Sequence, residues 1–191
     1  MLAPLFGGRL PEGTSGPGLC AKLWEMGLRN LVTGWGSTPQ ERALRLPCDE
    51  LVPGARLVLH RAVDVDAPPE VVFRWLCQMR VAPYSYDLID NLGRRSPQEL
   101  TPGLERLELG QRFLIFRLVA FEPGRHITLG HRGPLFGELG ITYWIEPGSR
   151  LLMRLACNPP RLPLAGQVLA LGDLVMARRQ LLNFKRLAEA S

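Results

Sequence analysis

The spacing of apolar residues predicts two helices at the start of the chain. From Leu19 to about Thr33 the apolar residues recur at roughly helical spacing, which favours one helix over this range. Thr38 then offers an N-cap side chain and Pro39 occupies the first helical position. We therefore expect a second, short helix that ends near Pro47.

A strand and two more helices follow. Apolar and polar side chains alternate over residues 57 to 66, with His60 on the polar side, which predicts a half-buried strand. Residues 66 to 70 combine a capping Asp, two prolines and an acid, so a helix begins there. Ser85 can cap a further short helix through Asn91, and residues 93 to 110 form a loop.

The second half of the chain predicts a sheet and one long helix. Apolar patterns predict strands over residues 112 to 121, 126 to 132, 138 to 146 and 150 to 157, separated by short turns rich in Gly and Pro. Connections this short hold no crossover helix, so the strands pair antiparallel. Residues 164 to 189 then predict a final helix, and the whole indicates an α+β fold.

The predicted elements divide the chain into three parts. Residues 1 to 18 are rich in Gly and Pro, so we expect a disordered segment. Residues 19 to 53 form a helical leader, and residues 54 to 191 form one domain. The apolar face of the first leader helix needs a cover, which is either the core or a second copy of the chain in a homodimer.

Charge and composition exclude several classes of function. The net charge of +5 comes from residues scattered along the chain, whereas nucleic-acid binders gather basic residues on one element. The four cysteines stand far apart without a CxxC pair or a close histidine, so we expect no metal site, no cofactor and reduced thiols. No segment is apolar enough for a signal peptide or a membrane span, so we expect a cytoplasmic protein.

Five motifs resemble those of a known superfamily. They are VDVDAPPEVVFRWLCQM at 63 to 79, YSYDLIDN at 84 to 91, LELGQRF at 107 to 113, WGSTPQERALRLPCDELVP at 35 to 53 and GDLVMARRQLLNFKRLAE at 172 to 189. Together they resemble bacterial members of the START-like (SRPBCC) superfamily, which includes polyketide cyclases and aromatase-like proteins. The resemblance implies a helix-grip fold, in which a curved antiparallel sheet wraps around the long C-terminal helix.

Asp173 is the most informative polar residue of the final helix. It shares one helical stripe with Ala170, Ala177 and Leu181, so an unbroken helix places a carboxylate on an otherwise apolar face. A buried acid needs a partner, for which Arg117 or Arg154 on the strands are candidates. Alternatively, Gly172 breaks the helix and Asp173 only caps its second half.

Two other groups are candidates for the wall of a pocket. Tyr84 and Tyr86 flank the start of a short helix, where they either line a pocket or serve core packing. Arg117 interrupts an apolar alternation, so it is either an inward polar anchor or the sign of a bulge. We expect Trp144 to face the cavity, because Gly140 and Thr142 on the same strand face leave space beside it.

These observations favour a binding function. We expect an apolar cavity between sheet and C-terminal helix that holds a small hydrophobic, lipid-like or polyketide-like molecule, with Tyr84, Tyr86, Arg117, Trp144, Asp173 and Ala177 as candidate ligand-binding residues. The alternatives are a polyketide cyclase or dehydratase, and a protein-interaction domain whose cavity is incidental. No nucleophile-and-base pair or known catalytic motif is present, so no catalytic residue is assigned.

Overall fold

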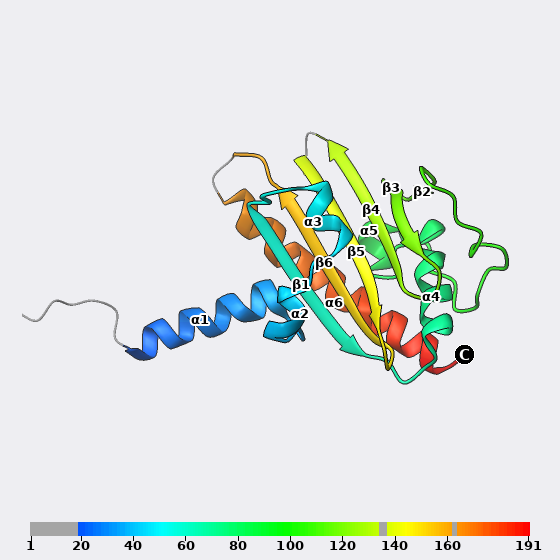
Figure 1. Cartoon of the computed structure of the whole chain (residues 1–191), viewed down its shortest axis with the longest axis horizontal. Helices are drawn as coiled ribbons and strands as arrows, with labels where there is room; N and C mark the ends of the chain where they lie inside the picture. The colour runs from blue at the N-terminus through cyan, green and yellow to red at the C-terminus, as the bar shows by residue number, and fades with distance from the viewer. Residues whose placement is uncertain (1–18, 134–136, 162–163) are drawn as a thin grey trace, which may run out of the picture.

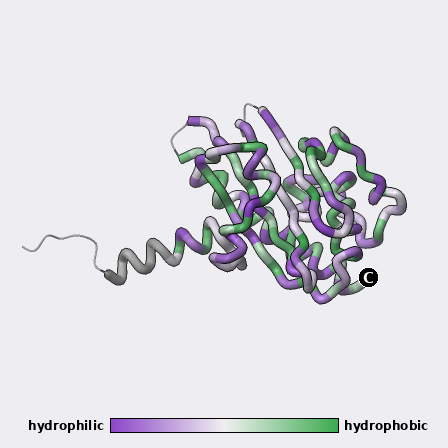
Figure 2. The backbone as a smooth tube through the Cα atoms, in the orientation of Figure 1, coloured by the Kyte–Doolittle hydropathy of each residue, from purple (hydrophilic) through white to green (hydrophobic). Residues whose placement is uncertain are grey.

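The computed structural model of the chain describes residues 19 to 133, 137 to 161 and 164 to 191. The segment from 1 to 18, for which the sequence predicts disorder, lies outside the described residues. Hydrophobic residues gather along the strands and the helices that face them (Figure 2), so the core lies between the sheet and these helices.

One antiparallel sheet of six strands forms the body of the molecule (Figure 1). Its strands are β1 (Leu57–Asp64), β2 (Arg112–Phe113), β3 (Phe116–Glu122), β4 (His126–Gly133), β5 (Gly137–Glu146) and β6 (Arg150–Asn158). Their order is β1-β6-β5-β4-β3-β2, so the five strands from β2 to β6 form a meander and β1 adds beside β6. The predicted antiparallel pairing is confirmed.

The long helix α6 (Ala165–Glu189) lies along one face of the sheet (Figure 1). It runs without a break through Gly172, so the alternative in which Asp173 caps a second helix is wrong. The helix α4 (Pro69–Cys77) packs against α6, and the 3-10 turn η1 (Gln78–Arg80) and the short α5 (Asp87–Asp90) follow it. A helix held in a curved sheet is the expected α+β helix-grip arrangement, which is confirmed.

Three helices precede the sheet. They are α1 (Leu19–Gly34), α2 (Pro39–Ala43) and α3 (Pro47–Leu51). The predicted cap of α2 is confirmed, because the Thr38 hydroxyl accepts a hydrogen bond from the Glu41 amide while the Glu41 carboxylate accepts one from the Thr38 amide. The helix α3 was not predicted from the sequence; it lies on the opposite face of the sheet from α6 and contacts β4, β5 and β6.

The leader is held to the sheet by a buried arginine. The Arg154 guanidinium donates to the carbonyls of Glu41, Arg42 and Leu44 at the end of α2, and pairs with the Asp49 carboxylate of α3 at 2.6 Å. Near the C-terminal end of α1, Leu28 and Leu31 remain about half exposed. A homodimer through this helix therefore stays a prediction.

The expected strand over residues 112 to 121 is interrupted. Leu114 has a left-handed backbone with φ of 56°, and a tight hairpin pairs Phe113 with Phe116. Further along, the register of β3 against β4 shifts between Leu118 and Ala120. The apolar alternation across this stretch therefore belongs to two strands and a bulge.

Candidate functional site

A cavity of about 700 Å³ lies between α6 and the inner face of the sheet. Its walls come from every second residue of two neighbouring strands, since side chains alternate between the faces of a strand: Leu139, Ile141 and Tyr143 of β5, and Met153 and Leu155 of β6. The α6 side contributes Leu169, Met176 and Ala177, among others. The volume falls within the range of sites that hold small-molecule ligands.

The edge of the cavity is also apolar. Leu114, Ile115 and Phe116 of the β2–β3 hairpin and Val168 of α6 belong to its lining. Ile115 is 54% exposed and Val168 is 68% exposed, so apolar groups reach from the cavity wall to the solvent. An apolar ligand would meet little polar surface at this edge.

Asp173 places a charge inside this apolar space. Its carboxylate lines the cavity and pairs with the Arg61 guanidinium of β1 at 2.7 Å, with the Asp173 side chain 7% exposed and that of Arg61 fully buried. Arg61 also donates to the carbonyls of His60 and of Val32 in α1. The buried ion pair therefore joins α6, β1 and the end of α1.

Neither of the expected partners reaches Asp173. Arg61 is registered opposite Met153, which lines the cavity, whereas Arg154 is the next residue along β6 and points to the other face. There Arg154 holds the leader helices. The assignment of Arg154 or Arg117 as the partner is therefore wrong, although the expectation of a buried carboxylate with an arginine partner is confirmed.

Burial controls the proton affinity of the groups around Asp173. It raises the pKa of Asp173 to about 6, although the Arg61 charge acts in the opposite direction. Burial and the nearby Asp173 charge both raise the pKa of Tyr143, so this phenol keeps its proton. The Tyr143 hydroxyl donates to Gln180 Oε1 at 2.6 Å, and Gln180 Nε2 donates to the Pro83 carbonyl at 2.6 Å.

A second carboxylate lines the cavity at Asp90, which accepts a hydrogen bond from the Ser85 hydroxyl. Among the described residues of the lining, none is Arg, Lys or His. The polar groups that face the cavity are therefore acceptors or neutral groups, and Arg61, which contacts Asp173, is already paired with that carboxylate. Such a lining disfavours an anionic ligand group.

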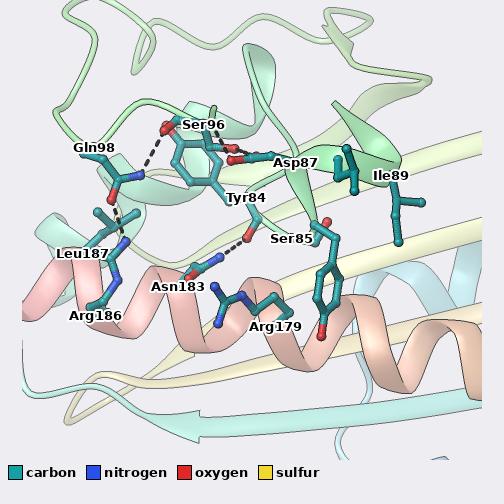
Figure 3. Close-up of a pocket in the computed structure, with 12 residues that line it drawn as sticks. Tyr84, Ser85, Asp87, Ile89, Ser96, Gln98, Arg179, Asn183, Arg186 and Leu187 are labelled. Atoms are coloured by element: carbon teal, nitrogen blue, oxygen red, sulfur yellow. Dashed lines mark hydrogen bonds between the residues drawn. The ribbon is translucent and has the colours of Figure 1, made fainter. Parts of the chain in front are cut away.

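Tyr84 and Tyr86 do not line this cavity. They belong to a neighbouring pocket of about 440 Å³ beside α6 (Figure 3). The Tyr84 ring is buried against Trp75 and Phe184, whereas Tyr86 is 39% exposed. Of the six candidate residues, the structure thus brings only Asp173 and Ala177 together in the large cavity.

Trp144 lies on the opposite face of the sheet. Its ring stacks on His126 with centroids 5.3 Å apart, and Arg125 lies over it at 4.8 Å. The space that we expected beside Thr142 is filled by α3, whose Cys48 amide donates to the Thr142 hydroxyl at 3.0 Å. The expectation that Trp144 faces the cavity is wrong, because the small residues beside it accommodate a helix instead of a ligand.

Arg117 is also outside the cavity. It is exposed and donates to the Gly110 carbonyl at 3.1 Å, so the role of inward anchor is wrong. The bulge alternative agrees with the register shift two positions away. Arg61, by contrast, was missed although its signal was present: it falls on the same side of its strand as the apolar Leu59 and Val63.

The described residues give little support for thiol chemistry, a metal site or a membrane span. Cys48, Cys77 and Cys157 are buried free thiols, and burial raises the pKa of Cys48 and Cys157 to about 11, which disfavours thiolate chemistry. Across residues 19 to 133, 137 to 161 and 164 to 191, no group of three or more potential ligands could hold a metal ion. In the same part of the chain no helix is long and apolar enough to cross a membrane.

Comparisons with known proteins give only distant likenesses. No family model matches the chain, and no curated protein matches it. Among solved structures, a Chromobacterium violaceum protein is 18% identical with a TM-score of 0.45, and the match covers 69% of this chain and 96% of that one. The di-domain ARO/CYC StfQ from the steffimycin biosynthetic pathway is 15% identical with a TM-score of 0.47, covering 70% of this chain and 50% of that one.

A second di-domain ARO/CYC, BexL from the BE-7585A biosynthetic pathway, is 16% identical with a TM-score of 0.45, covering 74% of this chain and 53% of that one. The chain thus spans about half the length of the two di-domain proteins. Likenesses this distant carry no inference about what the chain binds or does.

Proposed function

We propose that this protein binds a small, uncharged hydrophobic molecule that carries a hydroxyl group, in the cavity beneath α6. The observation that carries the proposal is an apolar cavity of about 700 Å³ whose buried carboxylate is already paired with an arginine. Apolar walls supply most of the binding free energy, and a few polar groups orient the ligand. A polyketide-like phenol, a sterol or a long-chain alcohol has this chemistry.

The polar lining supports an alcohol or phenol over an acid. Asp173 has one arginine partner, so a ligand hydroxyl can donate a further hydrogen bond to its carboxylate. A ligand carboxylate would instead face Asp173 and Asp90 with no free cation among the described lining residues. Two like charges in a poorly solvated site repel strongly, so the acid would bind weakly.

A matched pair of ligands tests this proposal. Native mass spectrometry and thermal unfolding at pH 8 would compare 1-decanol with decanoate, which have the same chain length, alongside sterols and aromatic polyketides. We expect the alcohol or phenols to be retained and to stabilise the fold, by about 2.7 kcal/mol at a hundred times the dissociation constant. Binding of decanoate in the large cavity that is tighter than that of 1-decanol, followed through the methyl resonances of Ile141 and Leu155 in its wall, would contradict the proposed polarity.

The absence of any retained mass or stabilisation across the panel would overturn ligand binding altogether. In that case a protein-interaction domain with an incidental cavity becomes the better explanation. Purification of the protein with a bound molecule from its expression host would add direct support, and its mass would narrow the ligand class.

A cyclase or dehydratase activity is a second candidate because of one observation. Asp173, with a pKa of about 6, lies in the same cavity as the protonated Tyr143. A carboxyl group with that pKa can exchange a proton near neutral pH, while the phenol can donate a hydrogen bond to a carbonyl oxygen. If the protein is an enzyme, the Asp173→Asn variant should still bind an aromatic polyketide but no longer convert it to product. Equal conversion by the unchanged protein and the variant would exclude a catalytic role for Asp173.

A further inference from the structure

The pocket of about 440 Å³ beside α6 differs in character from the large cavity. The helix contributes Arg179, Asn183 and Arg186, and the facing wall comes from residues 84 to 89 with Ser96 and Gln98 (Figure 3). Ser85 contributes to both spaces, so they are neighbours. This pocket carries cationic groups, which the large cavity lacks among its described lining residues.

The two arginines have no acidic partner among the described residues. Arg186 donates to Gln98 Oε1 at 2.7 Å, and the Arg179 guanidinium lies 6.0 Å from the centre of the Tyr86 ring. Asp87 also lines the pocket, but its two carboxylate oxygens accept hydrogen bonds from the Ser96 amide and hydroxyl. Two guanidinium groups and one carboxylate leave the pocket with a surplus of one positive charge.

A buried tyrosine with an unpaired hydroxyl belongs to the wall of this pocket. The Tyr84 hydroxyl is buried without a hydrogen-bond partner among the described residues, although such groups are nearly always paired in folded proteins. Tyr84 also has a left-handed backbone with φ of 57°, which is unfavourable for a bulky residue. Asn183 donates to its carbonyl at 2.7 Å and so holds Tyr84 in the wall of the pocket (Figure 3).

We propose that this pocket is a second site, which binds a small organic monoanion with a carboxylate group and an aromatic or aliphatic body. The carboxylate binds between Arg179 and Arg186, because guanidinium groups form strong, directional hydrogen bonds with carboxylates. The body of the ligand packs against Tyr86, Ile89 and Leu187, which belong to the apolar part of the lining. One negative charge matches the surplus of one positive charge.

Binding of 2-naphthoate to the full chain, measured by isothermal titration calorimetry, tests the site, with the uncharged 2-naphthylmethanol as the matched probe. We expect naphthoate to bind, and Arg179→Gln and Arg186→Gln each to weaken its affinity about tenfold, as expected for the loss of a charged hydrogen bond. Arg178→Gln is the control, since Arg178 is the neighbouring arginine on α6 and lies over Trp35, outside the pocket. It should bind naphthoate like the unchanged protein.

A site-resolved measurement separates this proposal from binding in the large cavity. Naphthoate should shift the methyl resonances of Ile89 and Leu187 in a nuclear magnetic resonance titration, and leave those of Ile141 and Leu155 in place. Tyr84→Phe should weaken binding while leaving the packing against Trp75 and Phe184 intact. The proposal is overturned if the Arg179 and Arg186 variants bind like the unchanged protein, if Arg178→Gln weakens binding equally, or if only the cavity methyls shift.

Discussion

Arg61 and Asp173 illustrate, at the scale of single residues, how a buried ion pair shapes a cavity. Removing two charges from water is costly, and their mutual attraction repays that cost only while both partners are present. The pair therefore contributes little net stability but makes each partner dependent on the other. It also balances the charge of the Asp173 carboxylate that lines the cavity.

Substitution of Asp173 by Leu should destabilise the fold by about 3 to 5 kcal/mol, because it leaves the fully buried Arg61 guanidinium without a counter-charge. The double variant Arg61→Met with Asp173→Leu should recover most of this loss, since it removes both charges. Chemical denaturation of the three proteins measures the effect. A loss below 1 kcal/mol for Asp173→Leu alone would mean that the ion pair is not buried in solution.

The raised pKa of Asp173 predicts a specific pH dependence. Because burial raises it from the usual 3.8 to about 6, the folded protein binds this proton more tightly than the unfolded chain does. The resulting stabilisation is complete below about pH 4 and is lost as the pH rises through 6. The difference in unfolding free energy between the unchanged protein and Asp173→Asn, measured by urea denaturation, should therefore favour the unchanged protein most near pH 4.

The difference in unfolding free energy between the unchanged protein and Asp173→Asn should become smaller by pH 7. Comparison with the variant is needed because other acids act in the opposite direction: Arg150 stabilises the charged form of Glu41 and contributes to the lowered pKa of that carboxylate. Their contribution is common to both proteins and cancels. A difference that stays constant from pH 4 to pH 7.5 would show that Asp173 titrates alike in the folded and unfolded states.

At the scale of elements, the continuity of α6 decides where Asp173 points. Gly172 lies inside the helix, and a methyl group added to its Cα would meet no atom within 4 Å outside the helix's own nearby backbone. The glycine therefore serves neither a turn nor a close approach. The helix continues through it because packing against the sheet outweighs the unfavourable helix propensity of glycine.

Gly172→Ala should consequently raise the free energy of unfolding by about 1 kcal/mol, since alanine favours the helix interior by this amount. Gly36→Ala is a contrasting variant that should destabilise the protein. Gly36 has a φ of +74° and an added Cβ would lie 2.1 Å from the Ala62 carbonyl oxygen. Thermal and chemical denaturation measure both. Loss of stability in Gly172→Ala would indicate a break in the helix at this point.

At the scale of the whole molecule, the notable property is a large cavity beside a close-packed core. One end of α6 packs tightly through Leu181, Phe184 and Leu187, all of which are buried, whereas residues near Asp173 and Ala177 border open space. Empty apolar volume reduces stability, because its walls lose contacts that packed atoms would make. A cavity kept at this cost is consistent with ligand binding.

Two alanines of α6 provide a matched test, because one lines the cavity and the other lies in the packed core. Ala177→Met projects into the cavity, so it should change stability by less than about 1.5 kcal/mol and abolish the ligand-induced stabilisation. Ala188→Met enters the packed core and should cost about 1 to 3 kcal/mol. Thermal unfolding with and without 1-decanol measures both effects. Unchanged ligand stabilisation in Ala177→Met would place the ligand elsewhere.

The sequence determined the elements of this fold to a large extent. The antiparallel meander, the capped helix at Thr38 and the long final helix follow from local patterns, because periodicity, turns and caps are properties of short segments. Asp173 was visible in the sequence as an interruption of an apolar face, and it indicated a buried charge. Arg61 interrupts an apolar face in the same way but was not predicted, and pairing it with Asp173 required more than the pattern.

Only the tertiary structure decided which partners meet and which face of the sheet is hollow. Both faces of the central strands are apolar enough to be buried, so the pattern could not tell the cavity from the side covered by α3, and Trp144 was assigned to the wrong one. Arg61 reaches Asp173 because β1 is added beside β6, a pairing between segments far apart in sequence. Contacts of this kind depend on topology and register, which no local pattern encodes.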